Sequence, residues 1–122
     1  MQTKGKKALG QLGEEMACDF LRSRGHRILE RNWHGSHLEV DIISEADDGV
    51  HFVEVKTRTG ADAAPEEKVD ARKQQRISAA ALKYLNESGS DREVFFDVVS
   101  VVFDGAHTQV KYFPKAWIPM YT

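Results

Sequence analysis

The chain has 122 residues, of which 41% are hydrophobic and 30% charged. This balance is typical of one globular domain, so we expect a single domain over residues 1–122. The net charge of −2 excludes a strongly basic nucleic-acid-binding protein, so a nucleic-acid partner would need a local basic surface. The lone cysteine, Cys18, excludes an internal disulfide, and no segment has the apolar length of a signal peptide or membrane span. We therefore expect a cytoplasmic protein without a membrane partner.

The first predicted element is a helix over residues 9–24, LGQLGEEMACDFLRSR, in which apolar side chains recur at helical spacing. Gly25 is suited to end this helix. Cys18 falls within the helical pattern, where we expect a small buried side chain rather than a reactive thiol. The preceding residues 1–8 are rich in lysine, and we predict that they form a flexible basic arm.

Three strands are predicted next, because apolar and polar residues alternate along each of them. Their sequences are HRILERNW (26–33), LEVDII (38–43) and HFVEVKT (51–57). ADDG (46–49) has the composition of a hairpin loop between the second and third strands.

A second helix is predicted from about Pro65 to Asn86, because proline is favoured in the first turn of a helix. VFFDVVSVVF (94–103) is almost entirely apolar, which indicates a strand that is covered on both faces. TQVKYF (108–113) predicts a last strand, and residues 114–122 are expected to be a tail.

This order, α-β-β-β-α-β-β, predicts an α/β fold with a mixed five-stranded sheet flanked by helices. The long helix between the third and fourth strands is a crossover connection, which makes those two strands parallel.

The predicted hairpin brings charged residues together. If ADDG is a four-residue loop, Glu45 pairs with Val50, and the same register places Asp41 opposite Glu54 and Glu39 opposite Lys56. Facing carboxylates destabilise a sheet unless a cation neutralises them, and carboxylate oxygens suit Mg²⁺. Lys56 would then orient or deprotonate a metal-bound water, or neutralise charge on a phosphate. The alternative is that these charges are only the solvated face of a half-buried sheet.

Asp41 followed by Glu54-Val55-Lys56 resembles the PD-(D/E)xK signature of restriction-endonuclease-like nucleases, although no proline precedes the aspartate. The predicted element order also resembles the core of that fold. More closely, four blocks resemble the YraN-like family, a group of small bacterial proteins assigned to that fold, over roughly residues 10–113. These blocks are GEEMACDFL, RNWHGSHLEVDII, FVEVKTR and FFDVVSV.

The resemblance implies a Mg²⁺ or Mn²⁺ site. It assigns metal ligation to the carboxylates of Asp41 and Glu54 and to the backbone carbonyl of Val55. Lys56 matches the signature lysine, and Glu14 matches an acid that many relatives of the fold place beside the metal.

Glu39 falls on the acid of the family's Gly-Glu-x-Asp block, where Leu38 replaces the usual glycine. We expect Glu39 to pair with Lys56 and raise the pKa of its ammonium group, which favours an electrostatic role for Lys56 over that of a general base.

Basic residues provide a candidate nucleic-acid-binding surface. Lys68, Arg72 and Arg76 are spaced four apart on the second predicted helix and, with Arg58, would contact a phosphate backbone. The alternative is a solvated helix face in which acidic neighbours balance the charge. Asp97 interrupts the most apolar strand, and for it we favour a structural role, since an unpaired buried charge is costly.

The histidines at 34, 37 and 51 do not make a convincing zinc site, because a fourth ligand is missing. Taken together, the sequence favours a metal-dependent endonuclease that hydrolyses phosphodiester bonds of DNA, branched DNA included. One alternative is a catalytically inactive nucleic-acid-binding or adaptor domain on the same scaffold, and another is a protein-interaction module. A homodimer is expected if the substrate is branched, because one small chain offers little surface to it.

Overall fold

A computed structural model describes residues 2–118, with side chains from residue 5 onward. Helix α1 (Gln2–Ser23) is followed by strands β1 (Arg27–Gly35), β2 (Leu38–Ala46) and β3 (Gly49–Thr59), helix α2 (Ala71–Ser88), and strands β4 (Val94–Asp104) and β5 (His107–Trp117). This is the α-β-β-β-α-β-β order predicted from the sequence. Neither helix combines the length and hydrophobicity that crossing a membrane requires.

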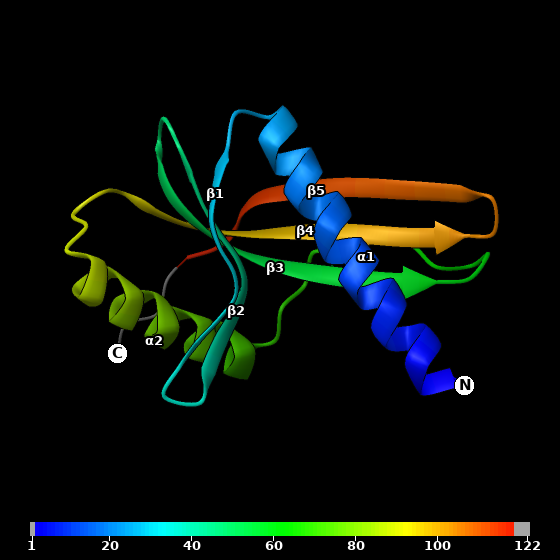
Figure 1. The fold of residues 1–122 in the computed structure, drawn as a ribbon, viewed down its shortest axis with the longest axis horizontal. Coiled ribbons are helices and arrows are strands. Elements are labelled where there is room, and N and C mark those ends of the chain that lie inside the picture. The colour runs from blue at the N-terminus through cyan, green and yellow to red at the C-terminus, as the bar shows by residue number, and fades with distance from the viewer. Residues whose placement is uncertain (1, 119–122) are drawn as a thin grey trace.

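The five strands form one mixed sheet in the order β1-β2-β3-β4-β5 (Figure 1). Strands β1 to β3 are an antiparallel meander, β3 and β4 are parallel, and β5 returns antiparallel to β4. The parallel pair confirms that α2 serves as the crossover connection, because parallel neighbours cannot be joined by a tight turn.

The two helices cover opposite faces of the sheet. Under α1, Ala17, Cys18 and Leu21 pack against Ile42 and Val53. The second apolar cluster, under α2, includes Phe52, Ile77, Ala80, Ala81 and Phe96. Buried residues along β4 contribute to both clusters, which explains why its sequence is apolar on both sides. Cys18 is fully buried, as the sequence predicted.

Several element boundaries differ from the sequence prediction. Helix α1 begins at Gln2, so residues 2–8, expected to be a flexible arm, continue the helix. Strand β5 extends to Trp117 and therefore includes residues 114–117 of the expected tail, while residues 119–122 lie outside the described range. The hairpin turn between β2 and β3 contains Asp47 and Asp48 only, because Ala46 pairs with Gly49.

The start of α2 also differs, and this difference affects the site described below. The helix begins at Ala71 rather than near Pro65, because Asp70 is the N-cap: it has extended φ and ψ angles, and its side chain accepts a hydrogen bond from the Lys73 amide at 2.9 Å. At the other end, Gly89 adopts the left-handed conformation with φ of 70° and ends the helix.

Asp97 has the structural role that we favoured. Its side chain is fully buried in β4, and its Oδ2 lies 2.6 Å from His51 Nδ1. The same oxygen accepts a hydrogen bond from the Tyr112 hydroxyl at 2.5 Å, and Oδ1 accepts one from the Lys115 amide at 3.0 Å. One carboxylate therefore joins β3, β4 and β5.

The ionisation of His51 should make this network pH-dependent. Burial alone would lower the pKa of His51, but hydrogen bonds to Asp97 and Asp48 outweigh burial and raise it. The stability that protonated His51 contributes is then complete below its ordinary pKa of 6.5 and is lost as the pH rises through the higher folded value.

We expect His51→Gln to lower the free energy of unfolding more at pH 6 than at pH 9, because only the lower pH retains the wild-type ion pairs. Urea denaturation of both proteins at the two pH values measures this difference. An equal loss at both would contradict the assignment of a charged His51.

Candidate metal and nucleic-acid site

The β2–β3 ladder has the register that the sequence predicted, but it is shorter. Ile43 lies opposite Phe52, as expected, and the last paired residues are Ile42 and Val53. The predicted pairings of Asp41 with Glu54 and of Glu39 with Lys56 lie beyond that end. There the Asp41 side chain replaces the backbone of β2 as the partner of β3: its Oδ2 accepts a hydrogen bond from the Val55 amide at 2.9 Å.

Asp41 and Glu54 are nevertheless near each other, because the Glu54 carboxyl is close enough for its charge to raise the pKa of Asp41. We call these two residues the carboxylate pair. The pKa of Asp41 is raised from 3.8 to about 7, first by burial and then by the nearby Glu54 carboxyl, against the opposing effects of the Val55 amide and the Lys73 charge. Two carboxylates that cannot both ionise freely form a donor set of the kind that a divalent cation stabilises.

Glu14 approaches the pair from the α1 side of the sheet. Gly13 lets the helix approach β3 closely, since a Cβ at that position would lie 2.3 Å from Thr57 Oγ1. Burial raises the pKa of Glu14, the Asn32 side chain opposes this by a hydrogen bond, and the charge of Asp41 adds to the rise. The charge of Asp41 therefore makes ionisation of Glu14 less favourable.

The described residues contain no group of three or more His, Cys, Asp or Glu side chains arranged to hold a metal ion. The structure thus joins Asp41 with Glu54 but does not bring Glu14 into one ligand set with them. Such a donor set fits a hard cation that keeps several water ligands, as Mg²⁺ usually does.

Lys56 and Glu39 have partners other than each other. The Lys56 ammonium donates to the backbone carbonyl of Lys68 and lies 3.8 Å from Glu66 Oε1. Glu39 Oε2 lies 3.1 Å from His34 Nε2. The prediction of a Glu39–Lys56 ion pair is therefore wrong. It assumed that β2 and β3 stay paired beyond Ile42 and Val53, where the two strands separate.

Sequence reasoning missed Lys73, although its ammonium group lies 2.5 Å from Glu54 Oε2. Burial alone would lower the pKa of Lys73, but the hydrogen bond to Glu54 and the nearby acidic charges raise it. Lys73 lies in the first turn of α2, where the helix dipole disfavours a cation. A lysine in the first turn of a helix indicates a carboxylate nearby that compensates for the dipole. The sequence could show this only if Asp70 were first identified as the N-cap.

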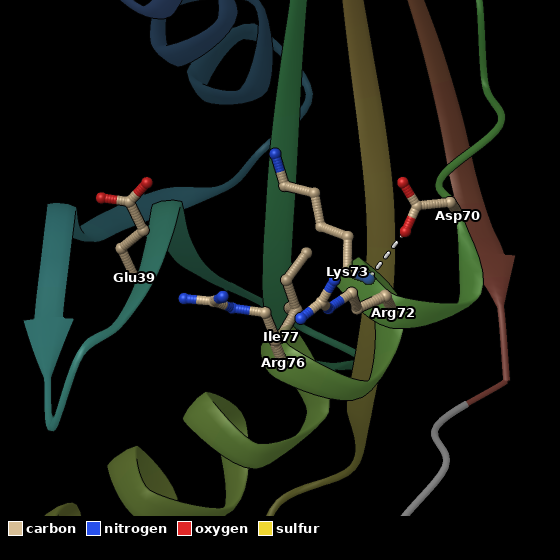
Figure 2. Close-up of a pocket in the computed structure, with 6 residues that line it drawn as sticks. All are labelled: Glu39, Asp70, Arg72, Lys73, Arg76 and Ile77. Carbon is tan, nitrogen blue, oxygen red and sulfur yellow. Dashed lines mark hydrogen bonds between the residues drawn. The ribbon is translucent and has the colours of Figure 1, made fainter.

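Beside the carboxylate pair, two adjoining cavities lie along the start of α2, and together we call them the basic cleft. One has a volume of about 290 Å³ and is lined by Glu39, Asp70, Arg72, Lys73, Arg76 and Ile77. Figure 2 shows the long basic side chains extending from α2, with Glu39 on the neighbouring strand. The second, of about 480 Å³, shares Arg72 and Arg76 and extends to His37 and Leu38 at the β1–β2 turn.

Only part of the predicted nucleic-acid-binding surface lies in this cleft. Arg72 and Arg76 are exposed on α2, and Arg76 also donates a hydrogen bond to the His37 carbonyl at 3.1 Å. Lys68 precedes the helix, and Arg58, at the end of β3, is paired with Glu66 at 3.1 Å. The cleft therefore presents Arg72, Lys73 and Arg76, and of these Lys73 contacts Glu54.

Comparison with known proteins identifies the family. Residues 13–101 match the model of "Uncharacterised protein family UPF0102". A UPF0102 protein of Syntrophomonas wolfei is 40% identical over 111 residues, which cover 89% of this chain and 96% of the relative. A UPF0102 protein of Nocardia farcinica is 44% identical over 107 residues, covering 86% of this chain and 84% of the relative. The chain therefore belongs to the UPF0102 family, the YraN-like group that its sequence blocks resemble.

Proposed function

We propose that this protein is a cytoplasmic, metal-dependent endonuclease of the restriction-endonuclease-like class, which binds DNA and hydrolyses its phosphodiester bonds. The observation that carries the proposal is the carboxylate pair beside the basic cleft. Glu54 is buried and its charge raises the pKa of Asp41, and Lys73, which lines the cleft together with Arg72 and Arg76, pairs with Glu54.

Each group has a role in this proposal. Asp41 and Glu54 would hold Mg²⁺ or Mn²⁺, with the Val55 carbonyl as a further ligand. When bound, such an ion supplies an activated water and stabilises negative charge on the phosphate. Arg72 and Arg76 would bind the phosphate backbone and place a scissile bond over the pair, since guanidinium groups contact phosphate oxygens in two places at once. Lys56 would neutralise charge that develops at the phosphate.

A second function, nucleic-acid binding without hydrolysis, is favoured by the contacts of Lys56. Its ammonium is held by the Lys68 carbonyl and lies near Glu66, so reaching a phosphate would require it to leave both. A domain with the basic cleft but without a free lysine at the signature position would bind DNA as an adaptor.

Purified protein incubated with linear duplex, single-stranded and four-way-junction DNA distinguishes the two functions. We expect cleavage of at least one substrate in Mn²⁺ or Mg²⁺ and none in EDTA, with loss of cleavage in Asp41→Ala and Lys56→Ala. Binding without cleavage under all metal conditions would support the adaptor. Cleavage that survives in Asp41→Ala would contradict the nuclease assignment and indicate a contaminating enzyme.

A further inference from the structure

The position of Lys73 links the two halves of the proposed site. Its backbone belongs to the first turn of α2, and its side chain lines the basic cleft together with Arg72 and Arg76. Its ammonium group contacts Glu54 Oε2 at 2.5 Å. The same cation is thus an ion-pair partner of the carboxylate pair and part of the wall of the adjoining cavity.

A divalent ion on the carboxylate pair and the Lys73 ammonium would compete for the charge of Glu54. The Glu54 side chain is only 8% exposed, so water compensates little for a second positive charge beside it. The Lys73 side chain is 52% exposed and belongs to a flexible residue type, so it can leave Glu54 at small cost. Once released, the ammonium remains in the cleft beside two arginines, where it needs a new anion.

We propose that Lys73 is a positioning residue that couples cation binding to phosphate binding. It holds Glu54 until a divalent cation displaces it, and it then turns to a nucleic-acid phosphate in the basic cleft. Cation and nucleic acid therefore promote each other's binding, with reciprocal effects on the two affinities. This inference rests on the proposed function, because it requires the carboxylate pair to bind a cation.

Lys73→Met tests the competition, because methionine keeps the aliphatic side chain and removes the charge. We expect its affinity for Mn²⁺, measured by titration calorimetry, to be about five- to tenfold higher than that of wild type, the range expected when a competing, partly exposed charge is removed. Lys73→Arg should restore the wild-type affinity. Lys83→Met is the matched control, since Lys83 lies on the same helix but pairs with Glu87 at 3.1 Å.

A second measurement tests the coupling to nucleic acid. Duplex DNA with phosphorothioate linkages resists hydrolysis, so its affinity can be measured by fluorescence anisotropy with Mn²⁺ and with EDTA. Wild type should bind it more tightly in Mn²⁺, and Lys73→Met should lose most of that gain while Lys83→Met keeps it.

The outcomes separate the inference from the function on which it rests. Wild-type protein that binds no Mn²⁺ would overturn both. If the wild type and Lys73→Met bind Mn²⁺ with the same affinity, only the role of Lys73 is overturned. The same conclusion follows if Mn²⁺ raises the DNA affinity of the wild type and of Lys73→Met equally. A Lys73→Met protein that merely unfolds at a lower temperature, with unchanged Mn²⁺ affinity, would identify an ordinary structural ion pair.

Discussion

Asp97→Ala is expected to lower the free energy of unfolding by about 3–5 kcal/mol, as removal of one partner of a buried ion pair typically does. The variant leaves the His51 imidazole, which is 3% exposed, beside a cavity instead of a carboxylate. It also removes the acceptor of the Tyr112 hydroxyl and of the Lys115 amide, and unmade hydrogen bonds of buried groups are costly.

Urea denaturation at pH 7 measures this loss. Asp19→Asn is the matched control, because Asp19 pairs with Arg22 on the surface with 77% of its side chain exposed, and such pairs contribute at most about 1 kcal/mol. An Asp97→Ala protein that loses no more stability than Asp19→Asn would show that the network does not join the strands energetically.

Asp41→Asn and Glu54→Gln should each lower the rate of metal-dependent DNA cleavage by at least ~10³-fold, or about 4 kcal/mol of transition-state stabilisation. Both amides keep the size of the side chain but remove a charge needed to hold the cation. Asp41→Asn should leave stability unchanged or increase it. Its amide oxygen can still accept from the Val55 amide, and the unfavourable charge beside Glu54 disappears.

The combination of lost cleavage and retained stability identifies a functional residue rather than a structural one. Single-turnover cleavage and thermal unfolding of the same preparations supply both values. Glu87→Gln is the control, since it removes a carboxylate that pairs with Lys83 on α2 and should affect neither. Cleavage by Asp41→Asn at more than a tenth of the wild-type rate would contradict the assignment.

Local sequence patterns were sufficient to predict the strand order and the hairpin register. The pairing of Ile43 with Phe52 follows from alternation and from the turn composition, and it holds although the turn is two residues shorter than expected. The parallel β3–β4 pair follows from the helix between the strands. The hairpin register depends on residues close together in the sequence, and the parallel pairing depends on the length and helical pattern of the connecting segment.

The point at which two strands separate could not be predicted in the same way. Extending the ladder placed Glu39 opposite Lys56, but β2 and β3 pair only as far as Ile42 and Val53. Asp41 nevertheless stays beside β3, because its side chain accepts a hydrogen bond from the Val55 amide, and there the charge of Glu54 raises its pKa. The carboxylate pair therefore forms through the contact of the Asp41 side chain with β3, and not through the direct cross-strand pairing that the sequence predicted.

Two further features depend on contacts between distant segments. Lys73 reaches Glu54 because α2 begins after Asp70, whereas a helix starting near Pro65 would place Lys73 beyond the first turn. His51 and Asp97 meet across the β3–β4 pair, in which Val53 lies opposite Asp97. The sequence marked Asp97 as a charge in an apolar strand, but its partner became identifiable only with the register of the parallel pair.

The central claim, that Asp41 and Glu54 together hold a divalent cation, is tested most directly by titration calorimetry with Mn²⁺. We predict one bound ion per chain for the wild type, and no measurable binding at the same concentrations for Asp41→Asn or Glu54→Gln. Wild-type protein that binds no Mn²⁺, or variants that bind it as the wild type does, would contradict the claim.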